Sequence, residues 1–302
     1  MITRTEYAGW AHNVKLSNGR IELIATLDVG PRLLRFAFID GANVMKEFPE
    51  HLGGCHEPDW VSRGGHRLWH APEAIPRTYA PDNAPVSLEE LDDFAIRLTP
   101  PPETANGIQK QLEVRMGAET DEVTVVHRLT NVGAWEITLA PWALSVMDAG
   151  GTAIIPLPEK RPHTEVLTPD FPLVLWPYTD LSDSRLSLGR RYITFAQDSA
   201  KGPAKFGMPL QLGWAAYLVH QTLFVKYFDY LPDAVYPDFG CSFEAFSNEA
   251  MLEVESLGPL APLAPGETVE HVETWRIFAN VPAITDEASI DRIIRPLVEQ
   301  SA

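Results

Sequence analysis

The stretch Thr268-Val-Glu-His-Val-Glu-Thr-Trp-Arg-Ile-Phe278 shows what kind of fold this chain adopts. In an extended strand, alternate side chains point to opposite faces, so the odd-numbered residues from Val269 to Ile277 share one face. A helix has no need of so many β-branched and aromatic residues, whereas strands favour them. The stretch is therefore predicted to be a long β-strand.

Segments of the same character recur along the chain, with turn residues between them. Asp28-Val-Gly-Pro31 and the residues 117–121 mark two of these turns. Candidate strands outside the quoted stretch are residues 20–26, 33–39, 109–116, 122–129, 135–139, 192–195, 211–217, 222–227, 242–246 and 251–256.

Helical periodicity is clear only near the C-terminus. Thr285 or Asp286 is a plausible N-cap there, and Pro296 is expected to kink or end the helix. Residues 87–93 are interpreted as a short turn of helix. The apolar positions with helical spacing are Ile290, Ile293, Ile294 and Leu297.

Many strands without alternating helices predict an all-β protein, a large and mostly antiparallel sandwich with a short C-terminal helix. The chain has 302 residues, of which 26 are proline, and this proline content implies many turns and ordered loops. The proline-rich stretches 81–85 and 100–102 are short and look like loops. We therefore expect residues 1–302 to form one domain.

The composition limits the classes of partner. A formal net charge of −17 disfavours nucleic acid and anionic membranes as partners. No apolar run approaches the roughly 20 residues needed to cross a bilayer, and no signal peptide is visible. Cys55 and Cys241 stand far apart, which fits a reducing compartment. These features predict a cytoplasmic protein.

The first polar cluster, which we interpret as a loop, is Arg63-Gly-Gly-His-Arg-Leu-Trp-His-Ala-Pro-Glu73. His66 and His70 are candidate proton donors, Arg67 offers charged hydrogen bonds to hydroxyls, and Trp69 offers a flat apolar face for a sugar ring. The alternative is a glycine bulge beside surface histidines and a buried tryptophan.

The second cluster spans residues 237–246, where Glu244 lies on the strand face opposite Cys241, Phe243 and Ala245. The next strand adds two more carboxylates, Glu253 and Glu255. Three carboxylates on neighbouring strands can orient hydroxyls, and their repulsion can raise the pKa of one of them. The alternative is an outward-facing surface glutamate.

Metal and cofactor chemistry find little support in the sequence. Cys55-His-Glu-Pro-Asp59, with His66 and His70, supplies enough ligand atoms, but the spacings match no zinc signature. No phosphate-binding glycine loop and no Gly-x-Ser-x-Gly elbow occurs. We expect neither a metal nor a cofactor.

Several of these segments together resemble the aldose 1-epimerases, also called galactose mutarotases. The best-matched part is Gly240-Cys-Ser-Phe-Glu244, followed by Leu263-Ala-Pro-Gly-Glu267 and the aromatic-rich final strand. Gly30-Pro-Arg32 and Arg128-Leu-Thr-Asn-Val-Gly133 add to the likeness, which thus extends over much of the chain. The resemblance implies the mutarotase-like β-super-sandwich and a small-molecule carbohydrate as ligand.

The resemblance also implies roles for individual residues. Glu244 falls on the base that takes the proton from the anomeric hydroxyl. The family's general acid is a histidine, and this chain has Pro141-Trp142 in that region. His66 or His70 would have to replace it. Arginine and lysine contacts would favour acidic or phosphorylated sugars. The expected substrate contacts are Arg32, Arg67, Trp69, Lys226, Glu253 and Glu255.

Three functions follow from this sequence. The leading one is an aldose 1-epimerase-like isomerase, in which the cluster from Gly64 to Glu73 and the strands with Glu244, Glu253 and Glu255 line one concave face. The second is a sugar-binding domain that has lost the acid. The third is a lyase acting on uronic acids, which would use basic residues near His66.

Overall fold

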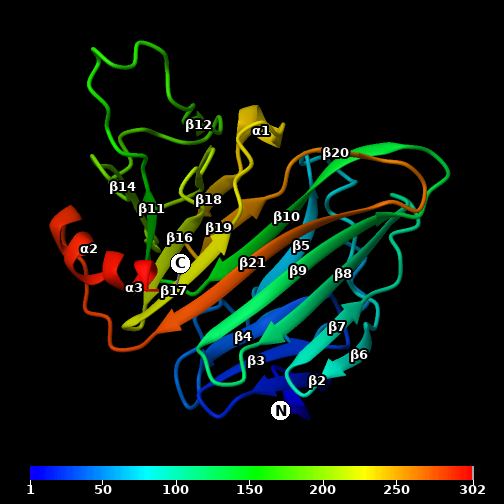
Figure 1. Ribbon diagram of the computed structural model, residues 1–302. Helices are drawn as coiled ribbons and strands as arrows, with labels where there is room; N and C mark the ends of the chain where they lie inside the picture. The colour runs from blue at the N-terminus through cyan, green and yellow to red at the C-terminus, as the bar shows by residue number, and fades with distance from the viewer. Residues whose placement is uncertain (301–302) are drawn as a thin grey trace.

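The computed structural model describes residues 1–300, and these form two large antiparallel sheets (Figure 1). The first sheet runs in spatial order through β1 (Ile2–Tyr7), β2 (Trp10–Ser17), β3 (Ile21–Thr26), β4 (Arg32–Phe38), β5 (His66–Ala71), β10 (Ile137–Met147), β19 (Leu252–Leu257), β18 (Phe243–Ser247), β15 (Ala204–Met208) and β12 (Val174–Leu175), with β20 (Ala261–Leu263) paired to β10. The second runs through β13 (Leu186–Leu188), β14 (Tyr192–Ala196), β11 (Thr152–Pro156), β16 (Trp214–Val219), β17 (Thr222–Phe228), β21 (Thr268–Phe278), β9 (Glu122–Asn131), β8 (Ile108–Met116), β7 (Ala95–Thr99) and β6 (Ser87–Asp92).

The strand quoted first, β21, lies inside the second sheet between β17 and β9. Its predicted alternation is confirmed, since His271, Glu273, Trp275 and Ile277 are all buried on one face. All the other candidate strands also overlap strands of the structure.

The main core lies between the two sheets. Phe36 of β4 packs against Trp275 of β21 with ring centroids 5.8 Å apart, and against Phe224 of β17 at 6.2 Å. Buried aliphatic side chains from both sheets continue this layer. The structure therefore confirms the predicted all-β sandwich.

The C-terminal helix is confirmed as two short pieces, α2 (Glu287–Ile293) and α3 (Arg295–Glu299). Asp286 is the N-cap, and its carboxylate accepts a hydrogen bond of 2.7 Å from the Ser289 amide. Pro296 stands in the first turn of α3, where its missing N–H costs nothing. Both pieces pack on β16 and β17 through buried apolar residues including Ile290, Ile294 and Val298.

Two local predictions are corrected. Residues 87–93 are not helical, because Ser87–Asp92 pairs with β7 as strand β6. Residues 66–71 belong to a buried strand, β5, and not to a loop. A further short element, α1 (Pro237–Gly240), is a turn with positive φ at Asp238 and Phe239.

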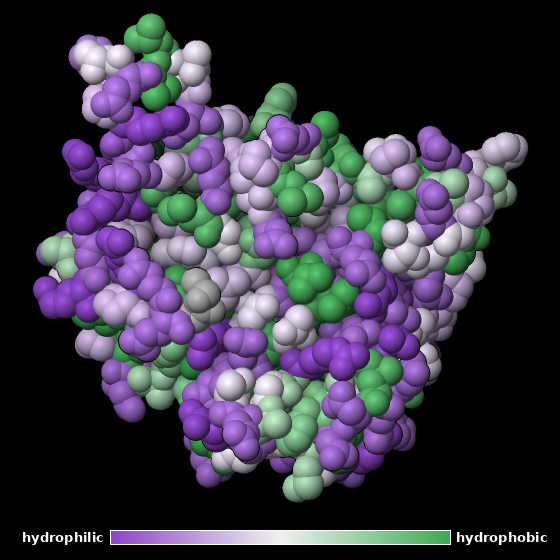
Figure 2. Space-filling model, viewed as in Figure 1, coloured by the Kyte–Doolittle hydropathy of each residue, from purple (hydrophilic) through white to green (hydrophobic). Residues whose placement is uncertain are grey.

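The surface is mostly polar on the face that Figure 2 shows. Hydrophilic side chains cover most of the face shown in Figure 2, and apolar ones form small separate groups. No helix among the described residues is long and apolar enough to cross a membrane.

Candidate functional site

The register of the first sheet places one row of side chains across four strands. Arg67 of β5 pairs with Leu144 of β10, Leu144 with Glu255 of β19, and Glu255 with Glu244 of β18. Directly paired residues of antiparallel strands point to the same face. This row therefore stands on the outer face of the sheet, away from the second sheet.

A pocket of about 220 Å³ opens on this outer face. Its polar lining residues include Arg67, Glu73, Lys205 and Glu253. Aromatic rings with one flat apolar side are the usual platform for a sugar ring. The aromatic residues that line it are Trp60, Trp69, Tyr79, Trp142, Tyr178 and Phe246.

Arg67 occupies one wall of this pocket. Its guanidinium carbon lies 4.4 Å from the ring centroid of Trp69 and 5.2 Å from that of Trp60. Its Nη1 donates a hydrogen bond of 2.8 Å to Glu253 Oε1. The charge of Arg67 is therefore already paired, and its plane is fixed by the two indoles.

Lys205 of β15 forms the opposite wall, and sequence reasoning missed it. Its Nζ lies 2.7 Å from Glu244 Oε2 and 3.0 Å from Glu255 Oε2, and between the rings of Trp142 and Trp176, at 4.6 and 4.7 Å. The sequence feature that could have indicated Lys205 as a site residue is its place in Ala-Lys-Phe-Gly-Met208, where a lysine interrupts a short apolar segment.

Glu244 and Glu255 lie directly beneath Lys205 and are fully buried. Burial raises the pKa of both carboxyl groups, although Lys205 pulls each pKa down. The charge of Glu255 adds to the rise at Glu244, and that of Glu253 adds to the rise at Glu255. Trp142 Nε1 donates a hydrogen bond of 2.8 Å to Glu255 Oε2. Glu244 Oε1 has no hydrogen-bond partner among the described residues.

A glycine makes room for Glu244. Gly207 is its cross-strand partner on β15, and a Cβ atom there would come within 3.1 Å of Glu244 Cγ and 2.7 Å of Cys241 Sγ. A side chain at position 207 would thus displace the carboxyl group that Lys205 contacts.

His66 and His70 do not reach this pocket, and the expectation that they line one face with Glu244 is wrong. Both point to the inner side of the sheet, because their row on β5 is offset by one residue from that of Arg67. His66 Nε2 lies 2.7 Å from His127 Nε2 of the second sheet. His70 Nε2 lies 3.6 Å from Glu103 Oε2.

Two further expected contacts also lie outside the pocket. Arg32 is fully buried and donates a hydrogen bond of 2.5 Å to Asp82 and one of 2.8 Å to the Gly64 carbonyl. Lys226 projects from β17 into the space between the sheets, with its Nζ 2.9 Å from Glu273 Oε1. Of the predicted site residues, the structure brings together Arg67, Trp69, Glu244, Glu253 and Glu255.

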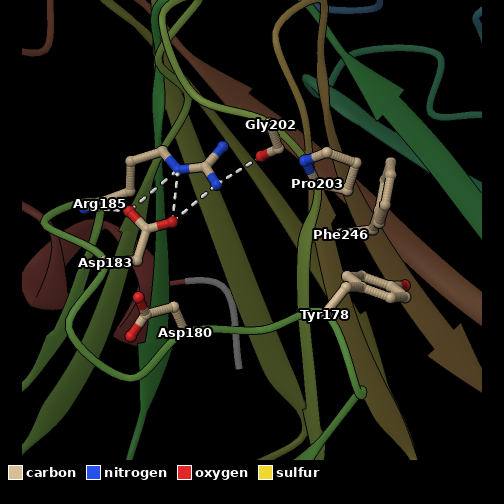
Figure 3. A pocket seen from close by; sticks show the side chains of 7 residues that line it. All are labelled: Tyr178, Asp180, Asp183, Arg185, Gly202, Pro203 and Phe246. Carbon is tan, nitrogen blue, oxygen red and sulfur yellow. Dashed lines mark hydrogen bonds and ion pairs between the residues drawn. The ribbon is translucent and has the colours of Figure 1, made fainter.

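A second, more open pocket of about 600 Å³ adjoins the first, and both are lined by Tyr178 and Phe246 (Figure 3). On its far side Arg185 is held by Asp183, with Nη2 2.8 Å from Oδ2, and by the Gly202 carbonyl at 2.7 Å. Tyr178 and Phe246 thus form an aromatic boundary that the two pockets share.

This chain resembles known proteins in its fold but not in its sequence. No family model matches the chain, and no curated protein matches it in sequence. Among solved structures, a galactose mutarotase-like protein from Lactobacillus casei is 10% identical over 88% of this chain and 100% of its own, with a TM-score of 0.57. A provisionally assigned aldose 1-epimerase from Klebsiella pneumoniae is 11% identical over 100% of this chain and 87% of its own, with a TM-score of 0.61.

A provisionally assigned mutarotase from Salmonella typhimurium gives the same result, with 11% identity, coverage of 92% of this chain and 94% of its own, and a TM-score of 0.58. At such identities the likeness concerns the path of the backbone and not the site residues. The chain therefore has the galactose mutarotase-like fold, in a sequence far diverged from these three structures.

Proposed function

We propose that the protein is an aldose 1-epimerase-like isomerase that binds a sugar ring in the outer pocket and catalyses exchange of its anomers. The observation that carries this proposal is Lys205, which bridges Glu244 and Glu255 at the wall of an aromatic pocket. The fold of the solved neighbours supports the same reading.

The chemistry of mutarotation suits a pair of adjacent carboxyl groups. Ring opening removes a proton from the anomeric hydroxyl, breaks the bond between C1 and the ring oxygen, and delivers a proton to that oxygen. Both oxygens are bonded to C1, so the base and the acid act close together. Burial raises the pKa values of both Glu244 and Glu255, and we assign one carboxylate and one carboxylic acid to this pair.

This arrangement replaces the histidine that is missing at Pro141-Trp142. Glu244 acts as the base, Glu255 as the acid, and Lys205 moves aside to admit the anomeric centre. Lys205 then stabilises negative charge on the oxygen that loses its proton.

The pocket favours a neutral sugar over an acidic or phosphorylated one. Its two cations are already paired, Arg67 with Glu253 and Lys205 with the two buried carboxyl groups. Glu73 adds a further carboxylate, hydrogen-bonded to the Tyr79 hydroxyl. A phosphate group would meet no unpaired cation among the described residues that line the pocket, so its desolvation would go uncompensated.

The test is a screen of neutral aldoses by polarimetry or NMR exchange, followed by Glu244→Gln. Glutamine keeps the shape but cannot accept a proton near neutral pH. We expect the catalysed rate to fall by at least ~10²-fold with little change in affinity. Glu270→Gln, at an exposed position of β21, is the matched control. An active protein that keeps its rate after Glu244→Gln would refute the assignment.

A sugar-binding domain without catalysis is the second candidate, because Glu244 and Glu255 are fully covered by other side chains. Binding of several sugars without anomer exchange would favour it. The lyase has less support, since it relied on basic residues near His66, which lies between the sheets.

A further inference from the structure

Three buried side chains converge between the two sheets, on the opposite side of β5 from the pocket. They are His66 of β5, His127 of β9 and Glu273 of β21, and all are fully buried. The two Nε2 atoms are 2.7 Å apart, and Glu273 Oε2 lies 4.0 Å from His66 Nε2 and 3.9 Å from His127 Nε2.

The three donor atoms lie close enough together to share one metal ion, with the two ring nitrogens at hydrogen-bond distance from each other. The point equidistant from the three donor atoms lies about 2.1 Å from each, as follows from the three separations. Zinc binds histidine nitrogen at about 2.0–2.1 Å and carboxylate oxygen at about 2.0–2.2 Å. Two histidines and a glutamate are also a donor set that zinc takes in other proteins.

The hydrogen bonding leaves a lone pair pointing at this site. His127 Nδ1 lies 3.0 Å from the His271 carbonyl oxygen, which can only accept, so Nδ1 carries the proton and Nε2 has a free lone pair. His66 Nε2 faces that lone pair at 2.7 Å. Either a proton or a cation must therefore lie between the two nitrogens.

The surrounding groups hold the three donors in place. His66 Nδ1 lies 2.9 Å from Ser145 Oγ, and Trp275 Nε1 donates a hydrogen bond of 2.7 Å to Glu273 Oε2. Glu273 Oε1 is paired with the ammonium group of Lys226, which lies at 2.9 Å. Such outer partners are a regular feature of metal sites.

We propose that His66, His127 and Glu273 bind one divalent transition-metal ion, best matched by zinc, that ties the two sheets together. This site does not depend on the proposed sugar chemistry, because it lies on the inner face of the first sheet. None of the three donors is exposed, so the ion enters while the chain folds.

The experiment uses the full chain, freed of any affinity tag, unfolded with a chelator and refolded with Zn²⁺ or Co²⁺. After dialysis we expect one ion per chain by elemental mass spectrometry, and a ligand-field spectrum for Co²⁺. His127→Asn should lose both, because asparagine keeps an N–H for the His271 carbonyl but brings no ring nitrogen to the site. His220→Asn, an exposed histidine paired with Asp148, is the control and should retain the metal.

Wild-type protein that refolds yet carries no more metal than the His127→Asn variant, and shows no Co²⁺ spectrum, would overturn the proposal and leave a proton shared by the two histidines. If the His127→Asn variant does not fold, measurements on the wild-type protein alone test the proposed metal site. Metal must then raise its thermal stability and the Co²⁺ spectrum must report nitrogen ligands, and failure of either contradicts the site.

Discussion

Lys205 controls the electrostatics of the outer pocket at the level of single residues. It is the only cation within contact distance of Glu244 among the described residues, and it lowers the pKa that burial otherwise raises. Because the base must be ionised, activity should rise with pH through this raised pKa. We therefore expect the acid limb of the kcat/KM profile to lie above pH 4.5, the usual value for glutamate.

Replacing Lys205 by methionine should shift that acid limb to still higher pH, since the carboxyl pair loses its counter-charge. The measurement is kcat/KM for anomer exchange against pH, with Lys201→Met, an exposed lysine just before the same strand, as control. An unchanged limb in Lys205→Met would show that Glu244 is not the titrating base.

The sequence indicated several side chains of the outer pocket, but it did not indicate which other side chains each of them contacts. The alternation of β5 separates His66 and His70 from Arg67 and Trp69, yet it does not say which pair faces the pocket. That depends on β10 and β19, which pair from distant parts of the chain. For the same reason Lys205 could not be linked to Glu244, 39 residues away on a separate strand.

At the scale of elements, strands with alternating or β-branched patterns were predictable, as β9, β17 and β21 show. Strand β5 was not, because His66-Arg-Leu-Trp-His-Ala71 is buried on both faces despite its polar residues. Residues 87–92 have a local pattern that also suits a helix, and only pairing with β7 makes them a strand.

The C-terminal helix offers a test at this scale. The Asp286 carboxylate accepts from the Ser289 amide, and the Ser289 hydroxyl accepts from the Asp286 amide at 3.1 Å. Asp286→Ala removes the first bond and should lower the free energy of unfolding by about 1 kcal/mol. Denaturant unfolding measures this, with Asp286→Asn, a residue that still caps, as control. No loss in the alanine variant would show that α2 does not contribute to stability through its cap.

At the scale of the whole molecule, Glu103 links the two sheets. Its Oε1 forms an ion pair with Lys110 Nζ of β8 at 2.5 Å, and its Oε2 lies 3.6 Å from His70 Nε2 of β5. Burial alone would raise its pKa, but Lys110, His70 and Asn106 outweigh this and lower it to about 2. The ionised form therefore stabilises the fold above pH 4.5, and this contribution is lost as pH falls toward 2.

If residues 1–302 form one domain, as we propose, unfolding followed by tryptophan fluorescence and by circular dichroism should coincide in one transition.

We expect Glu103→Gln to lower the free energy of unfolding by roughly 2–3 kcal/mol at neutral pH and to flatten the decline of that free energy between pH 4.5 and 2. The pKa of Glu113 is also lowered to about 2, by three arginines, so Glu113→Gln within the second sheet is a positive control that should flatten the same decline. A decline in Glu103→Gln as steep as in the wild type would contradict the stabilising role of the ionised Glu103.

The row of paired residues across β5, β10, β19 and β18 also has a consequence for how the protein can change. Side-chain direction along a strand has a period of two, so a slip of one residue in the pairing of β19 would turn Glu253 and Glu255 toward the core and Val254 toward the pocket. Single substitutions at the outward positions, by contrast, leave the packed interior untouched. The pocket is thus open to gradual diversification by point mutation, whereas insertions or deletions within these strands are a barrier that evolution can rarely cross.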